Sequence, residues 1–472
     1  MKQFYRIILN TFLFGIFFTT AFADDPEWVK YVGVRSLDIA EKEFKVNDYG
    51  AINNGTTLNT LAIQKAIDDC AAQGGGKVVF EKGKYLTGSI YLKTGVQLHI
   101  EEGVELLGSQ DIKDYPEINT RVAGVEMLWP SALINIIKQK NAAVTGEGII
   151  DAQGKPFWDA YWALRKEYEA KQLRWIVDYD AKRPRTLLVD SSWDILIEDI
   201  TLRRAGFWTV HILYSSYITV DGIVIQNNIG GHGPSTDGID IDSSSWILVQ
   251  NADIDCNDDN FCIKSGRDWD GLRVNRPTEY VLIQNSISRR GGGLITFGSE
   301  TSGGMRHILA RNLKAKGTNV GIRFKSATNR GGVVEDIQVQ NIEMDSVGLA
   351  IEISPNWNPS YSYSTLPEEF MGKAVPDHWT KMLEPVLPAE RGIPIFKNVH
   401  ISDIRVKDAK CAISADGLKE SPLKNFYFEN VKIEASQAGS IKNAENWKFK
   451  NVVISTEDGS KVQVSDSKNV SI

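Results

Sequence analysis

The feature that most constrains the fold is a short strand ending in asparagine, which recurs through the second half of the chain. Each copy is a short run rich in Val, Ile, Leu or Phe, and the copies end at Asn251, Asn285, Asn312, Asn341 and Asn430. Asn451 repeats the pattern 21 residues after Asn430. Strands that recur at such intervals, lengthened where a loop is inserted and without hairpin turns, predict a solenoid built as a parallel β-helix.

Asparagine suits the corner of such a coil because it tolerates left-handed backbone angles. Asparagines stacked on successive coils can also bond to one another. The 40 glycines of the chain fit the many turns that a solenoid needs. A β-sandwich or a propeller is the alternative all-β fold, but neither explains strands that recur without hairpins.

One segment near residue 60 has helical rather than strand spacing, and Gly74-Gly75-Gly76 ends it. Its apolar positions are Leu58, Leu61, Ala62, Ala66, Ile67 and Cys70. We expect this amphipathic helix to cap the open N-terminal end of the solenoid, where it would cover unpaired strand edges.

Two long segments rich in aromatic residues, 155–186 and 355–392, interrupt the repeat. Long loops in a compact fold are usually functional or disordered, and the aromatic content argues against disorder. Two interpretations stay open. The segments form the walls of a sugar-binding cleft, or they pack on themselves around a small core of their own.

The first residues predict a secretory signal peptide, residues 1–23. Lys2 and Arg6 precede an apolar run from Ile7 to Phe18, and Ala21-Phe22-Ala23 fits a cleavage site. The run is short for a membrane span, and no cysteine is placed for lipid attachment. We therefore expect a secreted or periplasmic protein whose residues 24–472 form one β-helix catalytic domain without a membrane span.

Charge and cysteine content exclude several classes of function. A net charge of −7 argues against nucleic acid as a partner, because binding phosphates normally requires a basic excess. Cys256 and Cys262 either pair locally or are small buried residues, and no spacing of Cys and His indicates zinc. We expect no metal and no cofactor. The sequence does not determine the oligomeric state, and we expect a monomer.

The candidate catalytic residues are three aspartates, Asp237, Asp258 and Asp259. Asp259 follows Asp237 by 22 residues, which is about one coil, so the two should lie roughly 4.8 Å apart on neighbouring coils. Carboxylates that close raise at least one pKa, which gives the protonated acid and ionised base that glycoside hydrolysis requires. Nearby Asp242, Asp253 and Asp255 are expected in turns or on the surface.

A group of cations follows the carboxylates. Arg323 and Lys325 flank Phe324, so in a strand they point the same way. Beside an acidic cluster, two such cations are suited to hold an anionic group of a substrate, and Arg makes bidentate contacts with carboxylates. Lys264 and Arg267 are further substrate-binding candidates, with weaker candidates at Arg273, Arg276, Arg289 and Arg290.

Together these motifs make the chain resemble glycoside hydrolase family 28, the polygalacturonase family of pectin-degrading enzymes. The similarity covers nearly all of residues 24–472. It includes Asp48-Tyr49-Gly50-Ala51 and Gly146-Glu147-Gly148. The Asn-Thr-Asp, Asp-Asp and Arg-Ile-Lys motifs of the family are matched by Ser235-Thr236-Asp237, Asp258-Asp259 and Arg323-Phe324-Lys325.

The resemblance implies an all-β fold, a single-stranded right-handed parallel β-helix like that of the pectin lyases. It also implies metal-free hydrolysis with inversion at the anomeric carbon. Asp258 would be the general acid, and Asp237 and Asp259 would position and activate water. Arg323 and Lys325 would bind a galacturonate carboxylate of an acidic pectic polysaccharide.

The main departure from the family is Gly292, in Gly291-Gly292-Gly293, where polygalacturonases have a Gly-His-Gly histidine. Family members that cleave rhamnogalacturonan are similar in lacking that histidine, so rhamnogalacturonan or its oligosaccharides is the favoured substrate. An exo-acting galacturonidase or polygalacturonase on homogalacturonan is the first alternative. A calcium-dependent lyase and a non-catalytic carbohydrate-binding β-helix are the others.

Overall fold

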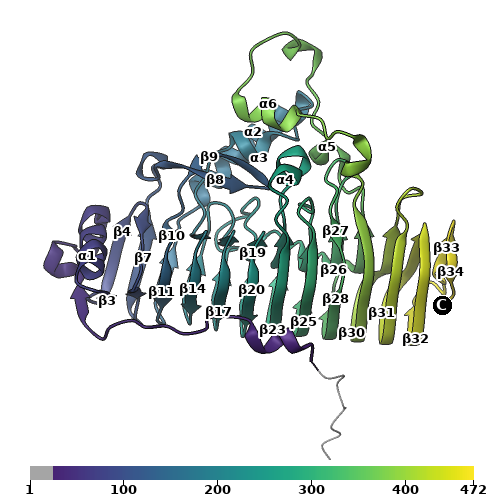
Figure 1. The fold of residues 1–472 in the computed structure, drawn as a ribbon, viewed down its shortest axis with the longest axis horizontal. Helices are drawn as coiled ribbons and strands as arrows, with labels where there is room; N and C mark the ends of the chain where they lie inside the picture. Colours follow the sequence, from purple (N-terminus) through teal and green to yellow (C-terminus); the bar gives the residue numbers. More distant parts are fainter. Residues whose placement is uncertain (1–24) are drawn as a thin grey trace, which may run out of the picture.

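The computed structural model describes residues 25–472, which form one long parallel β-helix with several segments projecting from one side (Figure 1). Three ladders of parallel strands build it. The first ladder contains β1 (Glu43–Lys45), β3 (Gly76–Val79), β6 (Val96–His99), β11 (Lys140–Thr145), β14 (Trp193–Glu198), β17 (Ser216–Asp221), β20 (Ser245–Gln250), β23 (Thr278–Arg290), β25 (Met305–Lys316), β28 (Ile337–Asp345), β30 (Ile395–Asp416), β31 (Leu423–Lys442), β32 (Ala444–Thr456) and β34 (Lys468–Val470).

The second ladder begins at β2 and continues in the later halves of the long strands β23 to β32. Its separate strands are β2 (Asn54–Leu58), β4 (Gly83–Thr87), β7 (Val104–Gly108), β12 (Ile149–Asp151), β15 (Thr201–Arg203), β18 (Val224–Gln226) and β21 (Asp253–Asp255).

The third ladder contains the strands that follow the candidate catalytic residues. Its strands are β5 (Ile90–Tyr91), β10 (Ile134–Ile137), β13 (Leu187–Asp190), β16 (Val210–Leu213), β19 (Ile239–Asp242), β22 (Phe261–Lys264), β24 (Gly293–Phe297), β26 (Val320–Lys325), β29 (Leu349–Ser354) and, after the ends of β30 and β31, β33 (Gln463–Ser465). A short strand, β27 (Val333–Val334), pairs with β25 and β30.

The core is a continuous stack of aliphatic residues inside the coils. Ile195, Ile218, Ile247 and Val281 are register partners on successive coils, and all are fully buried. Such inward-facing columns run the length of the solenoid and form one hydrophobic cluster. The predicted parallel β-helix is therefore confirmed.

The repeated asparagines lie at the coil corners, as the repeat predicted. The asparagines that end the repeated strands, at 251, 285, 312, 341, 430 and 451, have φ of 51–55°. Asn341 donates a hydrogen bond to Asn312, and Asn312 donates one to Asn285, so the side chains form a ladder along the axis. A second corner carries a similar ladder, in which Asn425 donates to Asn398 and Asn469 to Asn446.

Helix α1 (Thr60–Ala72) covers the N-terminal end of the core, as expected. Its residues Ile63, Ala66, Ile67 and Cys70 are fully buried and belong to the main cluster. The four cysteines of the chain are all free, so Cys256 and Cys262 do not pair. Both are buried small residues, which was one of the two interpretations.

Several segments project beside the third ladder. They contain the antiparallel hairpin of β8 (Glu117–Val122) and β9 (Val125–Pro130) and four helices, α2 (Lys155–Ala170), α3 (Val177–Asp180), α5 (Pro359–Ser362) and α6 (Asp377–Leu383). A further helix, α4 (Asp268–Val274), follows β22. Five short 3-10 helices complete the description: Glu27–Tyr31, Val46–Tyr49, Ile112–Asp114, Glu368–Phe370 and Ala389–Gly392.

We call residues 155–186 and 355–392 together the roof. The expectation that residues 155–186 form a loop was wrong, because α2 and α3 occupy much of that segment. Pro156 lies in the first turn of α2, where backbone N–H groups have no acceptor within the helix, so its missing N–H loses no hydrogen bond. Phe157, Trp158 and Tyr161 are the buried residues on one face of this helix. The roof has a core of its own that includes Trp175, Tyr179 and Trp379.

The predicted signal peptide, residues 1–23, lies outside the described residues. Within residues 25–472, no helix combines the length and apolar character needed to cross a membrane.

Candidate active site

The three predicted aspartates come together at the start of two neighbouring strands of the third ladder. Asp237 lies two residues before β19 and Asp259 two residues before β22, and the register of these strands aligns them on adjacent coils. One carboxylate oxygen from each of Asp237, Asp258 and Asp259 lies within 4.8 Å of the others. Asp237 and Asp259 are buried, whereas Asp258 is half-buried.

Asp259 is surrounded by donors and cations. Lys325 Nζ donates to its Oδ2 at 2.7 Å, Thr296 Oγ1 donates to its Oδ1 at 2.8 Å, and Arg323 lies at 3.6 Å. Burial alone would raise its pKa, but the two cations hold the pKa of Asp259 well below its ordinary value. This carboxyl is therefore ionised.

Asp258 has the opposite environment. Within residues 25–472 it makes no ion pair, and the backbone N–H of Asp259 donates to its Oδ1 at 3.0 Å. Burial, and then repulsion from Asp259, raise the pKa of Asp258 above its ordinary value. Two adjacent carboxyls thus have pKa values pushed apart, which is the pattern of a protonated acid beside an ionised base.

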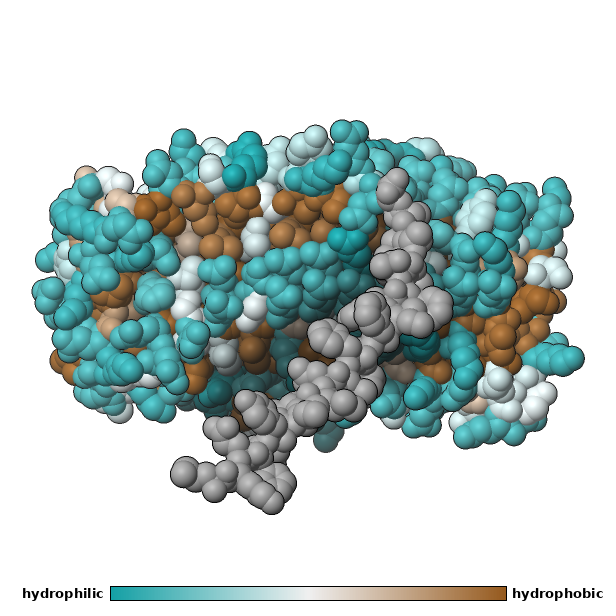
Figure 2. Space-filling model, turned by 90° about the horizontal axis from the view of Figure 1, so that it is seen from below, coloured by the Kyte–Doolittle hydropathy of each residue, from teal (hydrophilic) through white to brown (hydrophobic). Residues whose placement is uncertain are grey.

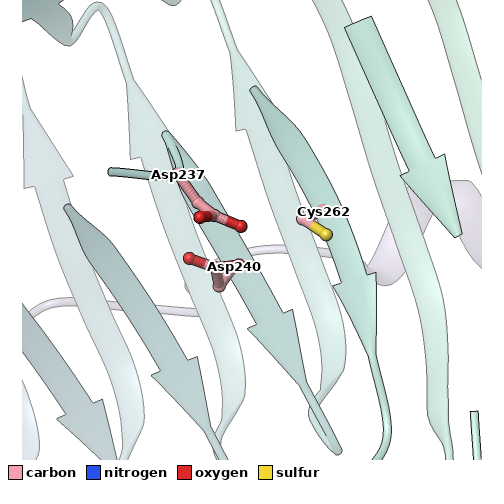
Figure 3. Close-up of side chains that lie close together, drawn as sticks. All are labelled: Asp237, Asp240 and Cys262. Atoms are coloured by element: carbon pink, nitrogen blue, oxygen red, sulfur yellow. The ribbon is translucent and has the colours of Figure 1, made fainter. Parts of the chain in front are cut away.

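Asp237 lies against Lys264, whose Nζ is 3.6 Å from its Oδ2. The same ammonium lies 3.5 Å from Asp240 and 3.4 Å from Glu300. Burial, followed by the charges of Asp240 and Asp258, raises the pKa of Asp237 well above its ordinary value. Figure 3 shows Asp237 and Asp240 pointing toward one another beside Cys262.

The predicted cations divide into two groups. Lys325 and Lys264 line the pocket beside the carboxylates, and Arg323 reaches within 3.6 Å of Asp259 while it also pairs with Glu352 at 2.6 Å. Arg267 does not reach the pocket. Its guanidinium is fully buried and donates to Asp268 and to the Tyr179 hydroxyl.

The weaker candidates also lie elsewhere. Arg289 and Arg290 pair with Asp253 and Asp255 on the outer surface, and Arg273 pairs with Asp270 and Glu126. Arg276 is an exposed residue whose guanidinium lies over the Tyr214 ring.

Asp242 was expected in a turn or on the surface, and this was wrong. It is fully buried at the end of β19, where Arg121 donates to it at 2.9 Å. Arg121 comes from the β8–β9 hairpin, which covers the outer face of this part of the third ladder. A strand covered on both faces buries every residue, so alternation of burial does not apply to it.

Gly292 lies beside Asp258 and Asp259. Its backbone N–H donates to the Asp258 carbonyl at 2.8 Å. A Cβ at this position would meet the carboxylate oxygens of Asp259 and Asp258 at 3.1 and 3.2 Å. A side chain here would therefore project directly onto the two carboxyls, and glycine leaves that space free.

The roof closes over the carboxylates and leaves a narrow pocket of about 70 Å³. Its wall includes Trp208, Trp357 and Tyr361, and the Trp357 ring lies 4.4 Å from Lys325 Nζ. Trp175 and Trp379 instead pack against each other, with ring centroids 5.6 Å apart, and tie the two halves of the roof together. Some aromatic residues of these segments thus line the pocket, while others form a small core of their own, as the second interpretation predicted. A larger groove of about 1100 Å³ beside α2 lies away from the carboxylates.

No sequence pattern indicated Arg174, which lines this pocket. Arg174 donates to Asp178 at 2.9 Å and lies over the Tyr361 ring. Ser235, where the family has Asn, donates to the same Asp178 at 2.9 Å, so a polar contact is retained at that position. Only the roof brings these residues together, and the coil repeat contains no signal for it.

A parallel β-helix with a roofed pocket that holds two neighbouring carboxyls with opposite pKa shifts is suited to the chemistry of the glycoside hydrolases. The sequence model of the family described as "Glycosyl hydrolases family 28" matches residues 70–367 of this chain. The chain belongs to this family, whose polygalacturonases are glycosyl hydrolases that characteristically invert the anomeric centre.

Individual relatives agree with this assignment. A probable polygalacturonase from Vitis vinifera is 27% identical over 402 residues, covering 82% of this chain and 73% of that protein. An exo-poly-alpha-D-galacturonosidase from Dickeya chrysanthemi is 26% identical, covering 88% and 71%. The solved exopolygalacturonase of Thermotoga maritima shares the fold, with a TM-score of 0.74 at 24% identity over 89% of this chain and 94% of that one.

Proposed function

We propose that this chain hydrolyses galacturonate-containing pectic chains, with Asp258 as the general acid and Asp259 and Asp237 as the groups that hold and activate water. The observation that carries the assignment is the contrast between two neighbouring carboxyls. Lys325 bonds Asp259 directly at 2.7 Å, whereas no cation bonds Asp258 within residues 25–472.

The roles follow from a balanced single displacement. Asp258 gives its proton to the glycosidic oxygen as the bond from that oxygen to the anomeric carbon breaks. A water oxygen attacks the anomeric carbon from the opposite face, and its proton passes to the ionised carboxylates. Because the carboxylate oxygens lie within 4.8 Å of one another, closer than the roughly 6.5–9.5 Å of most inverting pairs, the water must sit beside Asp237 and Asp259 on the pocket side.

The cations of the pocket support an acidic substrate. Lys325 and Arg174 both line the pocket, and the Arg174 side chain keeps 16% of its surface exposed. Each already neutralises one aspartate, so a galacturonate carboxylate would share their positive charge. Arg267, which was predicted to bind substrate, instead donates to the Tyr361 carbonyl and the Tyr179 hydroxyl within the roof.

Gly292 supports rhamnogalacturonan, in which rhamnose is the leaving sugar, as the preferred substrate. No side chain projects over the acid at this position, so nothing there is available to bind a second charged sugar. Rhamnose is neutral and needs no such partner. Homogalacturonan is the competing substrate.

The roof supports action at chain ends. A pocket of about 70 Å³ is smaller than the roughly 300–1,000 Å³ of most ligand sites, so a sugar must displace part of the wall to enter. A terminal unit can do this more easily than the middle of a long chain. We also propose that residues 1–23 direct secretion, which fits a polymeric substrate outside the cell.

Product analysis on rhamnogalacturonan oligosaccharides and on polygalacturonic acid tests this proposal. We expect NMR to detect new reducing ends of inverted configuration. They should form faster from rhamnogalacturonan than from polygalacturonic acid. Sugars should be released one unit at a time. Asp258→Asn and Asp259→Asn should each lower kcat by about 10³-fold. The matched control Asp253→Asn, whose carboxylate pairs with Arg289 on the outer surface, should retain activity.

If both active-site variants keep full activity, the assignment of the acid and base is wrong. Faster cleavage of polygalacturonic acid would reverse the substrate preference, and a rapid fall in viscosity would show internal cleavage. Ultraviolet-absorbing products that disappear with a chelator would indicate a lyase, and binding without cleavage would indicate a carbohydrate-binding protein.

A further inference from the structure

Asp240 is a buried carboxyl directly behind Asp237 that the mechanism above does not use. It lies on β19, is fully buried, and neither of its oxygens accepts a hydrogen bond from a neighbouring donor. One oxygen lies within 4.8 Å of a carboxylate oxygen of Asp237 and of Cys262 Sγ (Figure 3). An ionised carboxylate in such a place would be costly, because nothing solvates it.

The charges around Asp240 do not balance if every acid is ionised. Lys264 is the ammonium that contacts this cluster, and it lies 3.4–3.6 Å from three acids, Glu300, Asp240 and Asp237. Burial, with Lys264 opposing it, raises the pKa of Asp240 well above its ordinary value, whereas nearby cations lower the pKa of Glu300. The titratable and charged groups that face Asp240 from the surrounding elements are Arg185, His211, Asp237, Asp259, Cys262, Lys264 and Glu300.

His211 does not supply the missing positive charge. It is the register partner of Asp240 on β16, and Arg185 donates to its Nδ1 at 2.8 Å. Burial lowers the pKa of His211 to about 4, so the ring is neutral near pH 7. Arg185 is a cation, but its guanidinium donates to His211, Thr120 and the Arg121 carbonyl rather than to an acid. With Glu300 ionised and Lys264 as the ammonium that contacts the cluster, Asp237 and Asp240 together keep one proton.

We propose that Asp240 keeps this proton and uses it to donate a hydrogen bond to one oxygen of Asp237, so that Asp237 stays ionised at the pocket and its other oxygen faces the attacking water. This rests on the function proposed above. The negative charge is more stable on Asp237 than on Asp240, because Asp237 lines the pocket whereas Asp240 has no access to it. Asp240 is therefore a positioning residue that acts through Asp237.

The same substitution, Asp to Asn, made separately at Asp240 and at Asp237 tests which of the two carboxyls holds the proton. In Asp240→Asn the amide still donates to Asp237, so we expect kcat/KM to fall less than about tenfold. In Asp237→Asn the carboxylate that holds water is lost, and kcat should fall by about 10³-fold. The reverse order, or an Asp240→Asn enzyme as inactive as Asp237→Asn, would overturn the proposal.

The pH profile supplies a readout that a purely structural role would not move. Above the unfolded pKa of about 4, the wild-type pair must retain a proton that it loses as the pH rises through its raised folded pKa. Asp240→Asn removes this ionisation. The alkaline limb of kcat/KM should therefore move to higher pH, and a limb that stays in place or moves to lower pH would contradict the shared proton.

Thermal unfolding near pH 7 adds a test that needs no substrate. Asp242 is the matched control, because it lies on the same strand and is equally buried but is ionised against Arg121, with its pKa lowered to about 2. Asp242→Asn should lower the melting temperature, whereas Asp240→Asn should leave it unchanged or raise it. Equal losses in the two variants would show that Asp240 is ionised.

These outcomes separate this inference from the proposed function. The unfolding comparison stands whether or not the chain cleaves pectin. Activities of the Asp237 and Asp240 variants are interpreted against Asp258→Asn. A fully active Asp258→Asn enzyme refutes the proposed acid, while an inactive one together with an inactive, natively melting Asp240→Asn refutes only the role of Asp240.

Discussion

At the scale of single residues, the position of one ammonium group distinguishes two adjacent aspartates. Lys325 bonds Asp259 and leaves Asp258 without a cation of its own. A depressed pKa stabilises the folded state above the unfolded pKa of about 4, and this stabilisation is lost as the pH falls through the folded value. The raised pKa of Asp258 has the opposite effect, because it destabilises the folded state above the unfolded pKa. The same contact thus affects both stability and the proposed chemistry.

Replacing Lys325 by Met should therefore raise the pKa of Asp259. We expect the acidic limb of kcat/KM to move to higher pH, since the base is then protonated over a wider range, and kcat/KM at the optimum to fall by about 10²–10³-fold. Stability should fall near pH 7 and somewhat less at pH 3, because below the unfolded pKa of about 4 the low pKa of wild-type Asp259 contributes progressively less stability. pH–rate profiles and thermal melts measure both effects.

Lys314→Met is the matched control, because this lysine lies on β25, is mostly exposed and pairs with Glu343. It should leave the pH profile unchanged. A Lys325→Met enzyme with the wild-type acidic limb would show that Lys325 does not control the base.

Residues that the sequence predicted well are those whose positions depend on the coil period. Asp237 and Asp259 are one coil apart in sequence and therefore neighbours in space. Arg174 and Asp240 were missed for a physical reason. The roof brings Arg174 to the pocket, and the importance of Asp240 depends on burial and on partners from other coils. No local pattern records either relationship.

At the scale of elements, the same limit explains the helices. The predicted capping helix is confirmed as α1, because its apolar spacing and its glycine stop are local signals. In α2 the buried Phe157, Trp158 and Tyr161 also have helical spacing, a local signal that the prediction of a loop missed. The packing of the two halves of the roof involves residues nearly 200 positions apart and has no counterpart in the sequence pattern.

The roof should be weakened most by Trp379→Ala. Trp379 packs against Trp175, Tyr168 and Phe370, and its Nε1 donates to Asp180 at 3.0 Å. We expect a local loss of about 3–5 kcal/mol, the usual cost of removing a buried aromatic side chain. Amide hydrogen exchange in residues 355–392 should accelerate, and internal cleavage of long chains should increase relative to release of terminal units.

Trp193→Ala is the control for this change, since Trp193 is 42% exposed and lies on the first ladder outside the roof. It should alter neither exchange in residues 355–392 nor the product pattern. If Trp379→Ala also leaves both unchanged, the packing of the two halves does not determine how chains enter.

At the scale of the whole molecule, the strap, residues 25–35, lies along the side away from the roof (Figure 1). Gly33 donates to the Trp246 carbonyl, Arg35 pairs with Asp194 at 2.6 Å, and Trp28 packs on Tyr280. The strap therefore touches β14, β20 and β23, which together with β17, the strand between β14 and β20, belong to four successive coils. The underside of the molecule shows both hydrophilic and hydrophobic side chains (Figure 2).

Coils of a solenoid normally contact only their nearest neighbours, so its stability is nearly a sum of local terms. The strap adds coupling between coils that do not touch. The Arg35 guanidinium also lies 3.9 Å from the centre of the Tyr217 ring, a cation–π contact that belongs to the same set. We expect the double variant Trp28→Ala/Arg35→Ala to lose about 1–3 kcal/mol of stability.

The loss should appear as faster hydrogen exchange in β14 to β23 together, with exchange in β31 and β32 unchanged. Catalytic activity should stay at the wild-type level, because the strap contacts the first ladder and no pocket residue. Tyr31→Ala, at an exposed position within the same segment, is the control and should change neither property. If exchange increases in only one coil of the double variant, the strap adds local contacts but does not couple distant coils, and the stability of this enzyme remains a sum over neighbours.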